Sequence, residues 1–180
     1  GSFYINDAEF VEVPMMSAEL NVNMLRTDQF DAVELPYGKG NWSMFVFLPH
    51  GENTVDEMIR DLDAPQWNKW MNDFSPAKGV DVKLPRFSFA YEESLKDVLI
   101  TMGMDHAFSS MADFSGILEG GGISISDVKH KTFIEVNEEG TEAAAVTSVE
   151  IELTSVGNYF IANRPFLFVI AEKSSNTILF

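Results

Sequence analysis

The sequence predicts an α+β fold in which β-strands predominate and a few short helices accompany them. Strand-like runs recur along the chain, with apolar and polar residues alternating at a period of two. Proline and glycine lie between or within these runs, as expected at turns and irregular strand positions. Only short segments show the repeat of an amphipathic helix. No linker, repeat or low-complexity tract divides the 180 residues, which suffice for one domain with a sizeable core.

The first strands are predicted near the N-terminus and in a β-hairpin. Residues 10–15 are extended, and Pro14 marks an edge or irregular position. Residues 31–35 and 42–48 have the pattern of paired strands, and the turn 38–41 between them contains two glycines. We therefore expect a hairpin that Pro49-His50-Gly51 closes.

Two helices are predicted directly after the hairpin. Thr54 is a suitable N-cap for a helix that runs through Leu62. The apolar residues of that helix fall on one side and are Val55, Met58, Ile59 and Leu62. Pro65 is tolerated in the first turn of a second helix, which carries Trp67 and Trp70.

The rest of the chain predicts strands with one further helix. Residues 80–90 read as a strand, and Leu84-Pro85 indicates a bend between two pairings. Residues 94–102 predict a short helix that Gly103 ends. Residues 123–136 alternate again, and the continuous apolar run 166–171 is typical of a strand buried on both faces.

Charge and composition exclude several classes of partner. The net charge is −16, from 12 Lys and Arg against 28 Asp and Glu, which argues against nucleic acid or an anionic membrane. There is no cysteine, so disulfides and thiol catalysis are excluded. The longest apolar run is too short to cross a bilayer. Asn41-Trp42-Ser43 fits a glycosylation acceptor, although a pattern this short is mostly accidental.

The arrangements of residues that catalyse reactions are missing. His50, His106 and His130 lie far apart and outside any metal-ligand spacing. No Gly-x-Ser-x-Gly motif presents a nucleophile, and the glycines at 120–122 lack the lysine of a phosphate-binding loop. The sequence therefore predicts a protein that is not an enzyme and that needs no metal or cofactor.

The most informative segment is residues 138–155, which alternates from Thr141 onward. One face carries small residues first and larger ones later, namely Thr141, Ala143, Ala145, Thr147, Val149, Ile151 and Leu153. The other face carries all the charges of the run. Gly140, directly before it, offers a hinge with little steric restriction. Periodicity alone would favour an ordinary strand, but the segment could also slide into an existing sheet with its small end first.

A resemblance decides between these two interpretations. The run at 138–145 resembles the hinge of the reactive-centre loop of inhibitory serpins, and its residues are Glu138, Glu139, Gly140, Thr141, Glu142, Ala143, Ala144 and Ala145. Residues 160–170, Phe-Ile-Ala-Asn-Arg-Pro-Phe-Leu-Phe-Val-Ile, resemble the C-terminal signature of that family. The loop between the two motifs, at about 138–160, also has the family's usual length.

Further matches run upstream in the order of the family. They are Val13–Met16, Leu35-Pro36, 43–49, 84–87, 95–108, 112–117 and 127–131. The resemblance implies a serpin-like multi-sheet fold that contains strands of the B and C sheets and part of the central A sheet. A serpin is normally about twice this size, so we expect residues 1–180 to be the C-terminal part of a single serpin domain, from a truncated or proteolysed protein.

The resemblance implies a suicide-substrate inhibitor of serine endopeptidases, with cysteine endopeptidases as a second class. The length of the family's loop places the reactive bond at Thr154-Ser155, with cleavage after Leu153 as an alternative. Thr154 suits elastase-like or subtilisin-like pockets, whereas Leu153 suits papain-like enzymes. Glu152 and Glu150 would repel a protease with an acidic cleft. The implied partners are such a protease and the missing N-terminal half of the same serpin.

The resemblance also implies a place for His130 and for the protein. His130 would lie in the shutter beneath the point where the central sheet opens, and a lone histidine among Val128, Phe133 and Ile134 is otherwise a core residue. In both interpretations we expect it to be buried and hydrogen-bonded. Localisation would be extracellular or periplasmic. The alternative function is a non-inhibitory serpin that acts as a carrier or chaperone, although such members carry bulky, charged or proline residues in the hinge.

Overall fold

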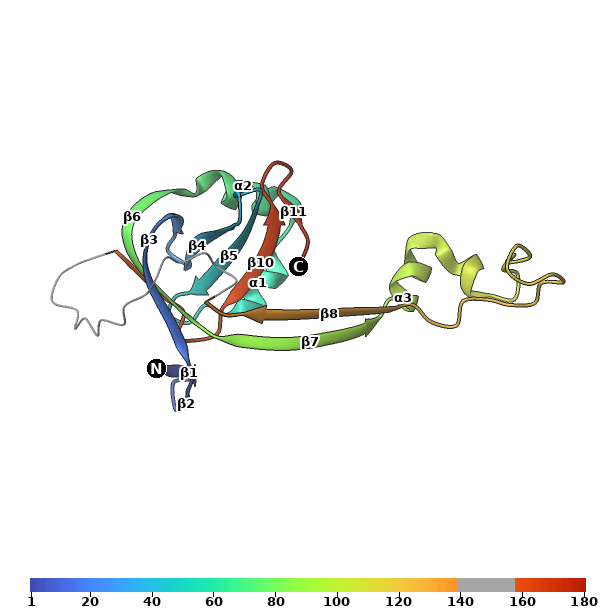
Figure 1. Ribbon diagram of the computed structural model, residues 1–180, viewed down its shortest axis with the longest axis horizontal. Coiled ribbons are helices and arrows are strands. Elements are labelled where there is room, and N and C mark those ends of the chain that lie inside the picture. The colour runs from blue at the N-terminus through green and yellow to red at the C-terminus, as the bar shows by residue number, and fades with distance from the viewer. Residues whose placement is uncertain (139–157) are drawn as a thin grey trace. The chain divides into compact units, whose positions relative to one another are not determined.

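Seven of the described strands form one twisted sheet in the computed structural model, which describes residues 1–138 and 158–180 (Figure 1). Their order across the sheet is β11-β10-β5-β4-β3-β6-β9. All neighbouring pairs are antiparallel except β6 and β9, which run parallel. The strands are β3 (Met15–Arg26), β4 (Phe30–Tyr37), β5 (Trp42–Pro49), β6 (Ser75–Pro85), β9 (Tyr159–Ile161), β10 (Leu167–Glu172) and β11 (Thr177–Ile178).

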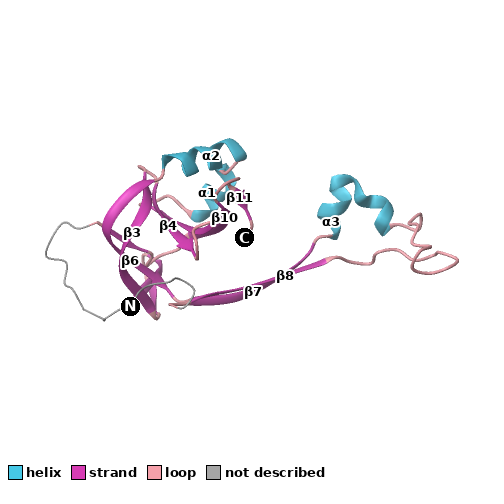
Figure 2. Cartoon of the chain, turned by 45° about the horizontal axis from the view of Figure 1, so that its top comes forward, coloured by secondary structure: helices cyan, strands magenta, loops and turns pink. Residues whose placement is uncertain are grey.

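The described chain divides into two compact units. The first comprises residues 1–87 and 136–180 and contains this sheet, a short hairpin of β1 (Ser2–Asn6) and β2 (Glu9–Glu12), and two helices. The second comprises residues 88–135 and contains most of a two-stranded sheet, β7 (Phe87–Ser94) with β8 (Lys129–Val136). It also contains α3 (Lys96–Leu99), η1 (Ile100–Met104) and η2 (Asp105–Phe108). Figure 2 distinguishes these strands from the few helices.

The hydrophobic core of the first unit lies between the sheet and the helices α1 (Val55–Asp61) and α2 (Ala64–Asp73). Trp67 and Trp70 of α2 are both buried. Their rings meet those of Phe45 and Phe30 edge-on, with centroids 5.9 and 4.9 Å apart. Aromatic pairs in this geometry contribute more than their buried area alone. The tryptophans predicted as helical core residues therefore fix α2 to the central strands.

Both helices begin where the sequence predicts. The backbone N–H of Glu57 donates to Oγ1 of Thr54 and that of Thr54 donates to the Glu57 carboxylate, at 3.2 and 3.0 Å. This reciprocal pair is a capping box, which satisfies two donors that a helix start leaves free. Asp63 caps α2 through the N–H of Gln66, with Pro65 in the first turn. Ile59, predicted on the apolar side of α1, is instead 53% exposed.

The predicted strands are confirmed, with differences in extent. The hairpin at 31–48 is β4 and β5, and the strand at 80–90 divides at Arg86 into β6 and β7, which pair with different partners. The helix predicted at 94–102 is α3 followed by the π-helical turn η1, where Gly103 has φ 95°. Of residues 123–136 only 129–136 form a strand. In β10 only Val169 and Ala171 are fully buried, so one of its faces is half-covered.

A buried carboxylate on the helix-covered face of the sheet links the side chains of three neighbouring strands. Glu34 of β4 is 4% exposed and accepts hydrogen bonds from Nδ2 of Asn23 at 2.7 Å and Oγ of Ser43 at 2.8 Å. Nζ of Lys173 completes the set with an ion pair. Burial by itself raises the pKa of Glu34, but the bonds from Lys173, Asn23 and Ser43 outweigh it, and the net shift is downward.

We expect Glu34→Gln to cost about 1–3 kcal/mol at neutral pH, because an amide cannot satisfy three donors. The lowered pKa of Glu34 in the folded state means that its ionised form adds stability above the ordinary value of 4.5. That contribution is lost as the pH falls through the lowered pKa that Glu34 has in the folded state. Urea unfolding should show the difference between wild type and variant narrowing as pH is lowered from 7 to 3. Glu52→Gln, in an exposed turn, is the control; a pH-independent difference for Glu34→Gln would contradict the argument.

Candidate functional site

The structure describes two of the residues predicted to have a functional role, Glu138 and His130. The other residues of the predicted hinge and reactive bond lie outside the described ranges, namely Gly140, Thr141, Glu142, Ala143, Ala144, Ala145, Glu152, Leu153, Thr154 and Ser155. Their roles stay predictions. What the structure does describe is how the chain is held on each side of this segment, at Glu138 and from Asn158 onward.

On the upstream side, Glu138 forms an ion pair with Arg86. Arg86 is the residue between β6 and β7, so its side chain extends from the bend that Leu84-Pro85 predicted. Both side chains are about half exposed, at 44% for Glu138 and 54% for Arg86. The hydrogen bond from Arg86 lowers the pKa of Glu138. An exposed ion pair of this kind contributes little to stability, and the chain before it is held by strand β8, which ends at the buried Val136.

We expect Arg86→Gln to return the pKa of Glu138 toward its ordinary value, because the guanidinium is the largest cause of the shift. Global stability should fall by less than about 1 kcal/mol, as for other exposed pairs. A carboxylate NMR titration measures the first effect and urea unfolding the second. Arg60→Gln, on the exposed part of α1, is a matched control that should leave Glu138 unchanged. A loss of several kcal/mol for Arg86→Gln would show that the pair is structural.

On the downstream side the chain enters the large sheet at once. β9 pairs in parallel with β6, matching Tyr159 with Asp81 and Phe160 with Val82. The N–H of Asp81 donates to the carbonyl of Asn158 at 3.0 Å, and the N–H of Ala162 donates to the carbonyl of Lys83 at 2.8 Å. Phe160 and Ala162 are 2% and 0% exposed. Backbone pairing and buried side chains therefore hold this end in the large sheet, whereas the upstream end follows β8 of the two-stranded sheet.

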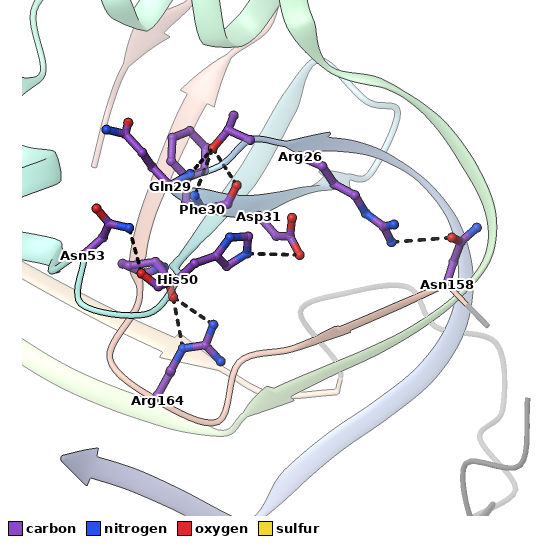
Figure 3. A network of polar contacts seen from close by, with 10 residues as sticks. Arg26, Gln29, Phe30, Asp31, His50, Asn53, Asn158 and Arg164 are labelled. Atoms are coloured by element: carbon purple, nitrogen blue, oxygen red, sulfur yellow. Dashed lines mark hydrogen bonds and ion pairs between the residues drawn. The ribbon is translucent and has the colours of Figure 1, made fainter. Parts of the chain in front are cut away.

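The residues after β9 are held to the end of β5 by Arg164 (Figure 3). Nε and Nη2 of Arg164 both donate to the carbonyl of Pro49, at 3.0 and 2.8 Å. Burial lowers the pKa of Arg164, and the carboxylate of Asp31 opposes that shift. Asp31 also lies 3.4 Å from Nε2 of His50, the residue after Pro49. Two strands and the segment that leaves β9 thus meet in one polar cluster.

The side chain of His130 is exposed and has no hydrogen bond or ion pair with a described residue, although the backbone of its strand β8 pairs with β7. The expectation that it is buried and bonded is therefore wrong for this structure. The reason is local: His130 lies near the start of β8, whose described partner in the sheet is β7 alone. The buried residues of this strand, Ile134 and Val136, lie at its other end. Its predicted role in the shutter stays a prediction.

Two further observations limit the chemistry of the described chain. Within residues 1–138 and 158–180, no group of three His, Cys, Asp or Glu side chains is placed to hold a metal ion. Over the same ranges, each helix is too short or too polar to cross a membrane.

Sequence reasoning gave no role to Arg86 or Arg164, although both lie in motifs that it had identified. Their partners, Glu138 and the Pro49 carbonyl, are far away in sequence. A backbone carbonyl leaves no trace in a sequence, so the Arg164 contact could not have been found. The opposite charges of Arg86 and Glu138 were a possible signal for this ion pair. Lys, Arg, Asp and Glu occur at many other positions, however, so the charges alone do not select this pair.

The curated relatives of this chain include one that is named as a protease inhibitor and several that are named as serpins. A serine protease inhibitor of Cyanea capillata is 36% identical over 183 residues, which cover 99% of this chain and 48% of that protein. Human Serpin B4 is 38% identical over 184 residues, covering 99% of this chain and 47% of that protein. The chain thus spans about half the length of the curated relatives it matches.

Solved structures share the fold over the same extent. Human thyroxine-binding globulin is 32% identical with a TM-score of 0.80, covering 99% of this chain and 47% of that one. Uncleaved ovalbumin is 28% identical with a TM-score of 0.82, covering 99% and 49%. The family model described as serpin (serine protease inhibitor) matches residues 1–180. The chain belongs to the serpin family.

Proposed function

We propose that this chain supplies the reactive-loop half of a suicide-substrate inhibitor of endopeptidases. Its targets are serine proteases with elastase-like or subtilisin-like pockets, and papain-like cysteine proteases as a second class. The other half of the inhibitor is an N-terminal segment, because the matched relatives are about twice as long as this chain. The protein would act outside the cytoplasm, in the extracellular or periplasmic space.

The observation that carries the proposal is the attachment of the two ends of segment 139–157 to different sheets, with β8 upstream and β9 downstream. Upstream, the side chain of Glu138 is exposed and bonded to an exposed Arg86. Downstream, β9 is part of the seven-stranded sheet and Phe160 is buried. A loop attached in this way can release its upstream limb after cleavage while its downstream end stays in place. The small residues of the predicted hinge suit the same limb for entry into a sheet.

The chemistry begins as ordinary proteolysis. The protease nucleophile attacks the carbonyl carbon of Thr154, and the peptide bond to Ser155 breaks. Ser155 leaves with a new amino group, protonated by the histidine of the protease, while Thr154 stays bound as an ester or thioester. The limb 141–153 then enters the central sheet as an added strand. The acyl-enzyme is carried with it and is distorted before water can hydrolyse the bond.

This mechanism requires a native state that is kinetically long-lived but is not the most stable arrangement of the chain. Entry of the limb is favourable only if no unpaired charge or proline has to be buried. The inward positions from Thr141 to Leu153 contain neither. Together with the family's name, this favours inhibition over simple proteolysis.

The deciding experiment incubates the full-length inhibitor, in which this chain follows its N-terminal half, with elastase, subtilisin and papain. We expect a covalent complex that survives SDS with at least one of them. Complete cleavage without a complex with all three would refute the proposal. Trypsin is the negative control, because no Lys or Arg lies between Glu138 and Asn163.

Mass spectrometry after brief treatment with elastase or papain should locate the cut at Thr154-Ser155, or after Leu153. The physical reason is that attack requires an exposed, suitably small or apolar side chain before the bond, and these two residues provide it at the position set by the family's loop length. A dominant cut near Gly157 or between Thr141 and Val149 would show that the assigned register is wrong.

The second candidate function is that of a non-inhibitory carrier. It is favoured by one observation, the similarity to thyroxine-binding globulin, which was solved in a complex with thyroxine. Ligand binding and inhibition are separable in the same protein. Isothermal titration with thyroxine tests the carrier, and binding with no covalent complex in the protease assays would favour it.

A further inference from the structure

The segment from Asn158 to Arg164 joins the predicted reactive loop to the body of the molecule. Its regular part, β9, has only three residues and lies at the edge of the sheet. Three parallel pairs with β6 supply few backbone bonds. The orientation in which the chain leaves the sheet at Asn158 therefore depends on further contacts at the two ends of this segment.

The far end is fixed by Arg164. Its guanidinium donates Nε and Nη2 to the single carbonyl of Pro49, at 3.0 and 2.8 Å, and the contact is partly buried. The planar fork of arginine can make this double contact, whereas the point charge of lysine cannot. The N–H of His50 in turn donates to the carbonyl of Gln29 at 2.8 Å, so the end of β5 is bonded to the turn before β4.

The near end is fixed less tightly by Asn158. Nη2 of Arg26 is 3.5 Å from its Oδ1, and its Nδ2 is 3.4 Å from the carbonyl of Lys78, both at the long limit of hydrogen bonding. Arg26 and Asn158 border an open hollow of about 310 Å³ that Met24, Ser75 and Ala77 also line. Since the side chain of Asn158 faces this hollow, close packing does not hold it there.

The two contacts share one support. Arg26 is the last residue of β3. Asp31, which lies beside His50, belongs to β4. Thr27 closes the turn between these two strands. Oγ1 of Thr27 accepts from the N–H of Phe30 and donates to its carbonyl, both at 2.9 Å (Figure 3). The β3–β4 turn thus lies between Arg26, which contacts Asn158, and Asp31, whose charge acts on Arg164.

We propose that Arg164 is a positioning residue for the reactive loop, with Asn158 as its weaker counterpart. Fixing segment 158–164 to the β3–β4 turn and the end of β5 sets the direction in which the chain leaves the sheet toward the reactive bond. This preorganisation raises the rate at which a protease attacks the loop. The proposal rests on the proposed function, but it concerns the first attack and not the fate of the acyl-enzyme.

The test compares Arg164→Lys with wild type in the full-length inhibitor. We expect the second-order rate of protease attack to fall about tenfold, because the lysine variant keeps the charge but loses the fork. The fraction of attacks that end in a covalent complex should stay unchanged, since it depends on the hinge. Hydrogen exchange should become faster at the amides of Asp81 and Ala162. Asn158→Ala should produce a smaller effect in the same direction.

Arg60→Lys, with a side chain on the exposed part of α1, is the matched control and should change none of these quantities. An Arg164→Lys protein with a lower melting temperature but an unchanged attack rate would make Arg164 merely structural and overturn the proposal. If the protein is a substrate and not an inhibitor, the attack rate can still be measured from cleavage. Failure of the proposed function is therefore distinguishable from failure of this inference.

Discussion

Replacing Thr141 by Arg should convert the full-length inhibitor into a substrate. Thr141 is the first residue of the inward face predicted for the inserting limb, so its side chain must be buried before any other can follow. An unpaired guanidinium would lose its hydration without gaining a partner, at a cost of several kcal/mol. A cost of about 3 kcal/mol at the first step would slow insertion about 100-fold relative to hydrolysis of the acyl-enzyme.

The measurement is the stoichiometry of inhibition together with SDS gels of the reaction with elastase. The variant should be cleaved at the same bond as wild type while forming almost no covalent complex. Ala144→Arg is the matched control, because it adds the same side chain on the outward face and should still inhibit. Undiminished complex formation by Thr141→Arg would show that the inward face is wrongly assigned.

The 180-residue chain by itself should be unable to trap a protease, even with its loop intact. Insertion requires a strand on each side of the incoming limb. We expect β8, which precedes the predicted hinge in sequence, to supply one of them, and we place the other in the N-terminal half. The described chain also exposes large apolar side chains, such as Met102, Ile117 and Phe133 at 75%, 79% and 68%. Such surface favours aggregation or association with the missing half.

The assay mixes the purified chain with elastase alone and then with the separately produced N-terminal half. We expect no covalent complex in the first case, and cleavage of the loop without inhibition. Adding the second half should increase solubility and restore some complex formation. The chain carrying Thr141→Arg, mixed with the same half, is the control that should remain inactive. Inhibition by the chain alone would contradict its assignment as half of a domain.

Strand and helix positions were predictable where local chemistry determines them. The turn with Gly38 and Gly40 defined the hairpin, and Thr54 and Pro65 marked the helix starts. The prediction at 123–136 was too long because alternation also continues where no partner strand is paired. Burial of His130 was expected from its apolar neighbours, yet burial depends on what covers a strand. A sequence pattern describes the residue and not its surroundings in space.

The candidate site was predictable in its motifs but not in its attachments. The hinge and the signature are contiguous runs, so the resemblance could be found residue by residue. The contacts of Arg86 with Glu138 and of Arg164 with Pro49 join distant parts of the chain, and one of them uses a backbone carbonyl. The attachment of the two loop ends to different sheets therefore became visible only in the folded arrangement.

The order of strands in the large sheet has a consequence for folding. β3, β4 and β5 follow one another as local antiparallel neighbours. In contrast, β6 and β5 also pair with strands that come much later in the sequence: Asp81 pairs with Tyr159, and Phe45 pairs with Val169. Non-local pairs of this kind form slowly. A nascent chain that has not yet reached Tyr159 leaves β5 and β6 with open edges, and open edges promote association with other chains. During synthesis, the late C-terminal strands pair with these edges, β10 with β5 and β9 with three residues of β6, and so shorten the open edge that association requires.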